Sequence, residues 1–135
     1  MNSLIQTIEK YLTLKPELEK AILDVTKIRN VKKKFTLLEI GQKCDSLYFV
    51  QKGILRGYYY HKRKDITTWF SMENEFMTST YSFISESPSH EGIEALEDSE
   101  LGEISAKDLN QLYTDFPEFN LVGRKLMEMY YVILE

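Results

Sequence analysis

One arginine and two aromatic residues are the side chains of this sequence best suited to binding a small molecule. Arg56 lies within the otherwise apolar run ILRGYYY, and a guanidinium group directed into an apolar interior would hold an anion such as a phosphate. On the outer face of an alternating strand the same residue would be an ordinary surface arginine, and this second interpretation is the favoured one. Trp69 and Tyr58 would suit the wall of a pocket, although aromatic residues of small β domains more often fill the core.

No arrangement of side chains in the sequence is typical of an enzyme active site. Cys44 with His61 or His90 would supply a nucleophile and a base, but no local pattern links them. Ser79 and Ser82 lack flanking glycines, so they do not form a nucleophile elbow. The glycines form neither GxGxxG nor a P-loop, and the histidines do not have HExxH spacing. We therefore expect no catalytic residue, no metal site and no enzyme activity, and an exposed Cys44 thiol beside a turn.

Length and charge favour one soluble domain. The 135 residues fit a single hydrophobic core. With 17 Lys and Arg against 21 Asp and Glu the net charge is −4, which argues against nucleic-acid binding by this chain alone. One cysteine excludes an internal disulfide and a CxxC site, and the N-terminus lacks the apolar stretch of a signal peptide. These features predict one cytoplasmic domain over 1–135 that does not contact a membrane.

Hydrophobic spacing and turn residues predict a mainly β fold with flanking helices. Two short helices are expected within 3–25, at 3–13 and from Pro16 to about 25. Between 28 and 105 the chain alternates short apolar runs with turns at Gly41, Gly53 and a polar hairpin tip at 61–65. The expected strands are 35–40, 47–52, 54–60, 66–72, 92–96 and 100–105, with a short helix near 77–85. Strands at this spacing suggest a sandwich or a closed barrel.

The polar segment 73–91 is where we expect any pocket. It is flanked by strands, so a short helix within it would present its first backbone amide groups to an opening of the barrel. Such an opening would favour an anion.

The last part of the chain, 105–135, is predicted to be helical, with Ser105 capping one helix and Pro117 opening a second. The second helix carries apolar residues at the alternating three and four spacing of a coiled-coil seam. The seam residues that we assign to a homodimer interface are Val122, Leu126, Met129 and Ile133. The alternative is that this stripe packs on its own barrel. The helix has no terminal cap, so we expect a longer parent protein.

Two stretches of the sequence contain motifs that resemble those of a known protein family. The segment TLLEIGQKCDSLYFVQKGIL contains, in order, Thr36-Leu37, Gly41, Leu47-Tyr48, Val50 and Lys52-Gly53, and it is followed downstream by Asn74-Glu75-Phe76. Together with the order of elements, these residues resemble the cyclic-nucleotide-binding domain of the Crp/Fnr transcription regulators. That family has Gly-Asp-Phe where this chain has Asn74-Glu75-Phe76. The resemblance covers 3–135. It implies a double-stranded β-helix, or jelly-roll, barrel and a long C-terminal dimerisation helix, followed in the family by a DNA-binding winged helix that this chain lacks.

The resemblance also implies where a ligand would bind, and the residues there differ from those of the family. Members that bind cyclic AMP use Gly-Glu-Leu for the ribose and Arg-Ser for the cyclic phosphate. Aligned without a gap, these motifs fall on Thr78, Ser79 and Thr80 and on Ser89 and His90. A serine supplies neither the charge nor the bidentate geometry of an arginine, and a histidine is mostly neutral at neutral pH. We therefore expect no tight binding of cyclic AMP, no certain cofactor, and another anionic or apolar effector or none.

These observations favour an effector-sensing regulatory domain of a Crp/Fnr-type DNA-binding transcription regulator. The parent would contact DNA through the missing C-terminal domain and would dimerise through the last helix. One alternative is the cyclic-nucleotide-binding module of an enzyme or channel, which the sequence after Glu135 would distinguish. Another is a cupin-type small-molecule-binding barrel, although a cupin metal site needs more histidines than the two present.

Overall fold

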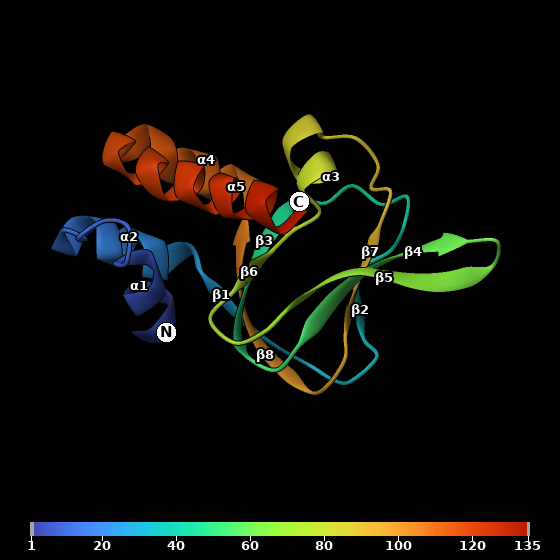
Figure 1. Cartoon of the computed structure of the whole chain (residues 1–135). Coiled ribbons are helices and arrows are strands. Elements are labelled where there is room, and N and C mark those ends of the chain that lie inside the picture. The colour runs from blue at the N-terminus through green and yellow to red at the C-terminus, as the bar shows by residue number, and fades with distance from the viewer. Residues whose placement is uncertain (1, 135) are drawn as a thin grey trace.

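The order of helices and strands confirms the expected mainly β fold with flanking helices. The computed structural model describes residues 2–134 and begins with α1 (Asn2–Ile8) and α2 (Pro16–Val25) (Figure 1). The strands are β1 (Lys27–Val31), β2 (Thr36–Leu38), β3 (Ser46–Lys52), β4 (Leu55–His61), β5 (Lys64–Ser71), β6 (Phe76–Met77), β7 (Gly92–Ala95) and β8 (Ser99–Ser105). The remaining helices are α3 (Thr80–Ser85), α4 (Ala106–Asp115) and α5 (Asn120–Leu134), with a 3-10 turn at Pro117–Phe119.

The strands form two antiparallel sheets, which corrects the expectation of a closed barrel. One sheet has the order β1-β8-β3-β6 and the other β2-β7-β4-β5. Within residues 2–134 no strand pairs across the two sheets. The chain passes from β5 to β6 through a turn, and β6 has only two residues, both paired with β3. This edge strand is too short to continue a ladder into the second sheet, so the barrel stays open there.

Two strands escaped the sequence-based prediction because they lack the alternation that marks a half-buried strand. In β1, KIRNV, only Val31 is buried, and the strand forms through its five-residue pairing with β8. β6 is shorter than any pattern can resolve. β1 and β6 both form because they pair with strands that are distant in the sequence, β8 and β3.

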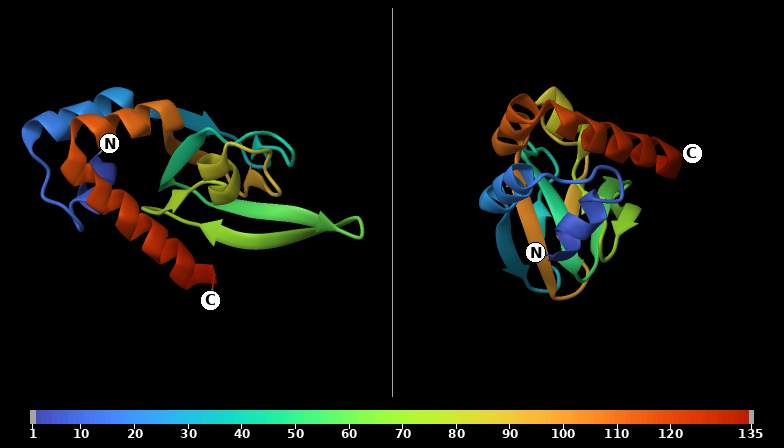
Figure 2. Two further views of the ribbon diagram at one scale, coloured as in Figure 1. Left: turned by 90° about the horizontal axis from the view of Figure 1, so that it is seen from above. Right: turned by 90° about the vertical axis from the view of Figure 1, so that its left-hand side faces the viewer.

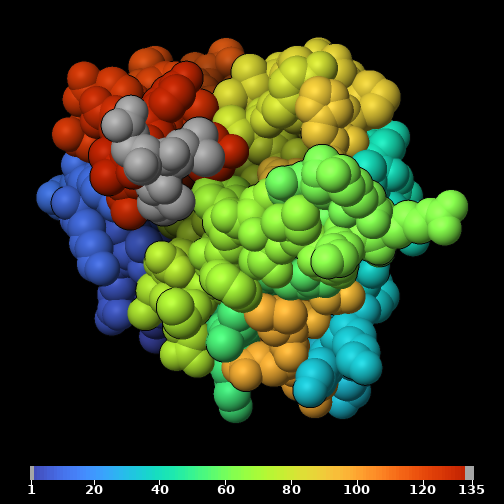
Figure 3. All heavy atoms as spheres, turned by 45° about the vertical axis from the view of Figure 1, so that its right-hand side comes forward, coloured from blue at the N-terminus to red at the C-terminus, as the bar shows by residue number. Residues whose placement is uncertain are grey.

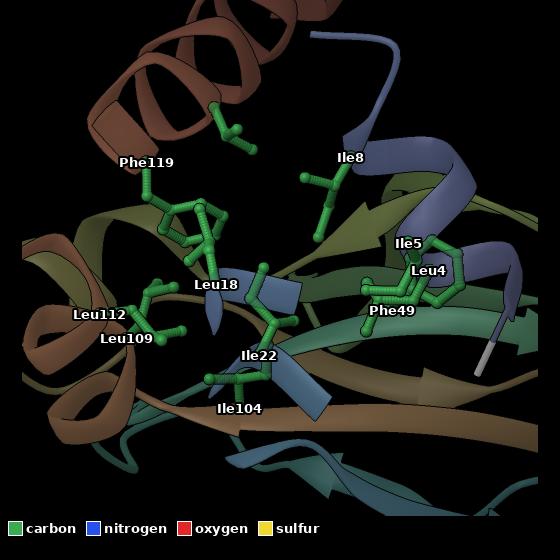
Figure 4. Packing of buried hydrophobic residues seen from close by; sticks show 11 residues of the cluster. Leu4, Ile5, Ile8, Leu18, Ile22, Phe49, Ile104, Leu109, Leu112 and Phe119 are labelled. Carbon is green, nitrogen blue, oxygen red and sulfur yellow. The ribbon is translucent and has the colours of Figure 1, made fainter. Parts of the chain in front are cut away.

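The buried residues form two clusters on either side of the first sheet. Alternation along β3 separates them, because Tyr48 and Val50 face the space between the sheets while Phe49 faces the helices. Figure 4 shows the helix-side cluster, where residues of α1, α2 and α4 gather around Phe49, Ile104 and Phe119. Helix α1 ends at Ile8, earlier than predicted, and Tyr11 and Leu12 pack on this cluster from the following turn.

The C-terminal helices pack along the helix-side cluster, and α5 then runs on towards β5 and α3 (Figure 2). The Ser105 side chain accepts a hydrogen bond of 3.0 Å from the backbone N–H of Asp108, which confirms the predicted cap. Pro117 opens a 3-10 turn, and the α-helix itself begins three residues later.

The predicted dimer seam does not form one exposed stripe. Val122 is 2% exposed and belongs to the chain's own core, and Leu126 packs against the same cluster. Met129 is about half-exposed and accepts a hydrogen bond from the Tyr11 hydroxyl at its sulfur atom. The side chain of Ile133 lies outside the described residues. In this structure the first half of the seam therefore serves the fold of its own chain, which is the alternative named above.

None of the helices within 2–134 combines the length and the apolar character that crossing a membrane requires.

Candidate ligand-binding site

Two buried serines form a hydrogen bond that links the two ends of the segment between β6 and β7. The hydroxyl groups of Ser79 and Ser89 are 2.7 Å apart, and the two residues are 1% and 2% exposed. Ser89 also donates to the carbonyl of Glu91 at 2.6 Å and accepts from the backbone N–H of Glu91 at 3.1 Å. The two hydroxyls thus form hydrogen bonds with each other and with the backbone of Glu91, and these bonds hold the segment in its conformation.

A cavity of about 310 Å³ lies where this segment meets the second sheet and the last helix. Figure 3 shows the face on which atoms of β4 and β5 (green), α3 (yellow) and α5 (red) meet. The lining residues come from all these elements and from the loop before β7: Tyr59, Thr68, Ser79, Tyr81, His90, Glu91 and Tyr130. Of the predicted ligand residues, Ser79 and His90 line this cavity. Another pocket, lined by residues such as Arg29, Tyr48 and Glu103, lies outside segment 73–91.

A bulge in β5 turns Thr68 towards this cavity. Gly57 pairs with Trp69 and Tyr58 pairs with Thr67, so Thr68 is the extra residue of the ladder. Its hydroxyl donates to a carboxylate oxygen of Glu91 at 3.2 Å. The neighbouring Trp69 packs over Gly57 and meets the ring of Tyr130 edge-on at 4.7 Å. Trp69 therefore supports the cavity wall from behind.

Arg56 does not line the cavity, which corrects its assignment as a ligand residue. Leu55 faces the core, so alternation puts Arg56 on the outer face of β4. There its guanidinium pairs with Asp65 and with Glu94 (2.9 Å) and lies 4.7 Å from the centre of the Tyr58 ring. The hydrogen bond to Asp65 is the main reason that the pKa of Arg56 is raised. This is the outward arginine that the sequence analysis favoured.

The remaining predicted positions have structural partners. The Thr78 hydroxyl donates to the carbonyl of Ser46 at 2.8 Å, which ties the end of β6 to β3. Thr80 borders the space between α3 and α5. Cys44 is buried, contrary to expectation, because its backbone N–H donates to the buried Ser82 hydroxyl at 2.7 Å and draws the chain beneath α3. His61 lies at the exposed hairpin tip, so Cys44 and His61 are not brought together.

Glu91 is the functional candidate that sequence reasoning missed. It is half-buried, and burial raises the pKa of its carboxyl group. Among the described residues no Lys, Arg or His nitrogen lies within 4.0 Å of this carboxylate. The alternation of side chains along the strand could have revealed it. Glu91 lies two residues before Ile93 and four before Ala95, both core residues, so its side chain is expected on the same inner face of the sheet.

Burial of Glu91 leads to a prediction about stability and pH. Because its folded-state pKa lies above the unfolded value, about 4.3, the folded chain holds this proton more tightly, and stability falls as pH rises through the folded pKa. Replacing Glu91 by Gln should therefore raise the midpoint of thermal unfolding at pH 7, with the difference vanishing near pH 4. The exposed Glu73→Gln is the matched control, which should leave the unfolding midpoint at pH 7 unchanged, because the Glu73 side chain has no ion pair among the described residues. A less stable Glu91→Gln variant at pH 7 would mean that the carboxylate stabilises the fold.

Fold and cavity together define a mainly β domain whose pocket lies under a short helix and beside a C-terminal helix. The family model described as cyclic nucleotide-binding domain matches residues 28–116, and the chain therefore belongs to that family. No curated protein sequence matches this chain.

Solved structures share this fold. A cyclic nucleotide-binding domain from Methylobacillus flagellatus superposes with a TM-score of 0.82 at 14% identity, over 96% of this chain and 77% of that one. The catabolite activator protein of Thermus thermophilus has a TM-score of 0.75 at 22% identity, over 91% of this chain and 56% of that protein. The sensor domain of the transcriptional regulator DNR from Pseudomonas aeruginosa has a TM-score of 0.75 at 14% identity, over 92% and 82%. This chain thus spans about half the length of the Thermus protein.

Proposed function

We propose that this chain is the effector-sensing domain of a Crp/Fnr-type transcription regulator and binds cyclic AMP weakly or not at all. The observation that carries the proposal is that one residue of the last helix, Tyr130, forms part of the cavity wall. Its ring also packs on Trp69, so a ligand that moves either aromatic residue would displace α5. In the proposed parent, α5 would connect the sensor to a DNA-binding domain.

The role is regulatory rather than catalytic, and regulation here means coupling between cavity and helix. A ligand shifts the position of α5 only by the difference between its affinities for two arrangements, typically about 1–3 kcal/mol. Two copies joined through the outer side of α5, where Met129, Tyr131 and Val132 are exposed, would transmit that difference to DNA bound by the rest of the parent protein. We place this regulator in the cytoplasm.

Weak binding of cyclic AMP follows from the charge of the cavity. None of its described lining residues is Arg or Lys, and Glu91 is acidic. A cyclic phosphate would lose its hydration without gaining a cation, and it would face a carboxylate of the same sign. Ser79 and Ser89 are bonded to each other, so using either hydroxyl for a ligand would break a buried hydrogen bond.

Calorimetric titration with cyclic AMP tests this prediction. We expect no saturable heat at low micromolar ligand, and a dissociation constant of about 10 μM or tighter would contradict it. A matched variant carrying Ser79→Glu and Ser89→Arg restores the residue types that the family uses at these two places. A gain of binding in this variant would locate the cause of weak binding in these two residues. Continued absence of binding there would instead attribute it to Glu91 or to the shape of the cavity.

A further inference from the structure

Resting on the proposed sensing role, we infer that the cavity takes an organic ammonium ion, because one carboxylate that has no cationic partner in the described part of the chain lies among several aromatic rings. The carboxylate is that of Glu91, and the rings are those of Tyr59, Tyr81 and Tyr130 with His90. This assigns to the cavity a ligand charge opposite to that of a cyclic nucleotide.

The charges of the residues that line the cavity favour a cationic ligand. Of its seven lining residues only Glu91 carries a formal charge when His90 is neutral. The other polar groups are hydroxyls and the His90 imidazole, and the Thr68 hydroxyl donates to the carboxylate itself. An anion entering this space meets no complementary charge, whereas a cation does.

Within residues 2–134, Glu91 also has no cationic partner that would neutralise it. Three other acids on these sheets are paired, Glu94 with Arg56, Glu103 with Arg29 and Asp65 with Arg56, whereas Glu100 of β8 has no ion pair among the described residues. The Glu91 carboxylate instead accepts from a neutral hydroxyl donor, that of Thr68, at 3.2 Å. A half-buried carboxylate that is left unpaired carries an uncompensated desolvation cost, and an ammonium group bound beside it would offset this cost.

Aromatic rings supply the second element of ammonium recognition. Cations bind over the faces of aromatic rings within about 6 Å of the ring centre. Tyr81 and His90 stack face to face at 4.3 Å with an angle of 22° between their planes, so each ring covers one face of the other and the outer face stays available to a cation. Tyr130 forms another wall and is held in place by its edge-on contact with Trp69. Tyr81 is 51% exposed, so its ring has surface left to cover a ligand.

The size of the cavity favours a compact ligand. About 310 Å³ lies at the lower end of the range of small-molecule pockets, roughly 300–1,000 Å³. A small alkylammonium or arylalkylammonium ion fits that range.

Matched pairs of probes test the inference at pH 8. The charged probes are choline and phenethylammonium, and their uncharged counterparts are 3,3-dimethylbutan-1-ol and 2-phenylethanol. Binding is followed by calorimetry and by the fluorescence of Trp69, the one tryptophan of the chain, which touches Tyr130. We expect a charged probe to bind at least about tenfold more tightly than its counterpart, since removing the charge removes its attraction to Glu91.

Variants assign the binding to these residues. Glu91→Gln should weaken the charged probe at least about tenfold, and Glu86→Gln, outside the cavity, should leave it unchanged. Tyr81→Ala should weaken it about threefold or more, and Tyr81→Phe, which keeps the ring, should restore it. Equal affinity for charged and uncharged probes, no effect of Glu91→Gln, or no binding of either ammonium ion at millimolar concentration would overturn the inference.

Two further results separate this inference from the proposed function. Cyclic AMP that binds more tightly than either ammonium ion would overturn the ligand class and leave a sensing role standing. Ammonium binding that leaves the self-association of the chain unchanged would support the ligand class and count against the sensing role.

Discussion

Replacing Val122 by Glu is expected to destabilise the folded monomer by about 3 kcal/mol or more. Val122 is 2% exposed and lies in the cluster that joins the helices to the first sheet, so the substitution buries an unpaired charge and removes apolar contact. Since small domains are stable by only about 5–15 kcal/mol, a loss of this size removes a large share of the free energy of unfolding. Urea denaturation followed by circular dichroism measures this loss.

The matched control is Val132→Glu on the outer side of the same helix. Val132 is 73% exposed, so this change should alter monomer stability by no more than about 0.5 kcal/mol. If α5 joins two copies through its outer side, sedimentation should show weaker self-association for Val132→Glu. The reverse pattern, a stable Val122→Glu monomer that no longer associates, would return Val122 to the dimer seam that its heptad spacing predicts.

Replacing Gly57 by Ala is expected to cost about 1–3 kcal/mol and to move the aromatic support of the cavity. A Cβ atom at Gly57 would lie 2.6 Å from two ring atoms of Trp69 and 2.7 Å from the Thr68 hydroxyl oxygen. Trp69 must then shift away from β4, and its edge-on contact with Tyr130 changes with it. Because the chain has one tryptophan, a red shift of its fluorescence reports this displacement directly.

Gly41→Ala separates steric crowding from backbone strain. Gly41 has a φ of +93°, and a Cβ atom there would meet no heavy atom within 4 Å, so alanine costs backbone energy without touching Trp69. We expect lower stability and unchanged emission. If Gly57→Ala also left the emission unchanged, the tight packing of Trp69 over Gly57 would not be what positions Tyr130.

Local patterns in the sequence were sufficient for most elements of the fold. Period-two alternation placed β3, β4, β5, β7 and β8, the helix from Pro16 to Val25 has the expected bounds, and Ser105 was recognised as a cap. These features depend on neighbours a few residues apart, which the sequence displays directly. The same patterns predicted a pocket at segment 73–91, and Ser79 and His90 of that segment line the cavity beside α5.

The chemistry of that pocket depended on contacts between distant parts of the chain. Nothing near Arg56 in the sequence reveals that Asp65 and Glu94 occupy its guanidinium, and nothing near Ser79 reveals its bond to Ser89. Heptad spacing assigned Val122 to a dimer seam, but spacing alone does not distinguish a partner helix from the chain's own core, where Val122 lies. By itself the sequence therefore determined which residues form strands and helices, since those preferences are local. Only the tertiary structure decided that Glu91 faces the cavity with no cationic partner among residues 2–134, because charge pairing depends on which side chains the folded sheets bring within a few ångströms of one another.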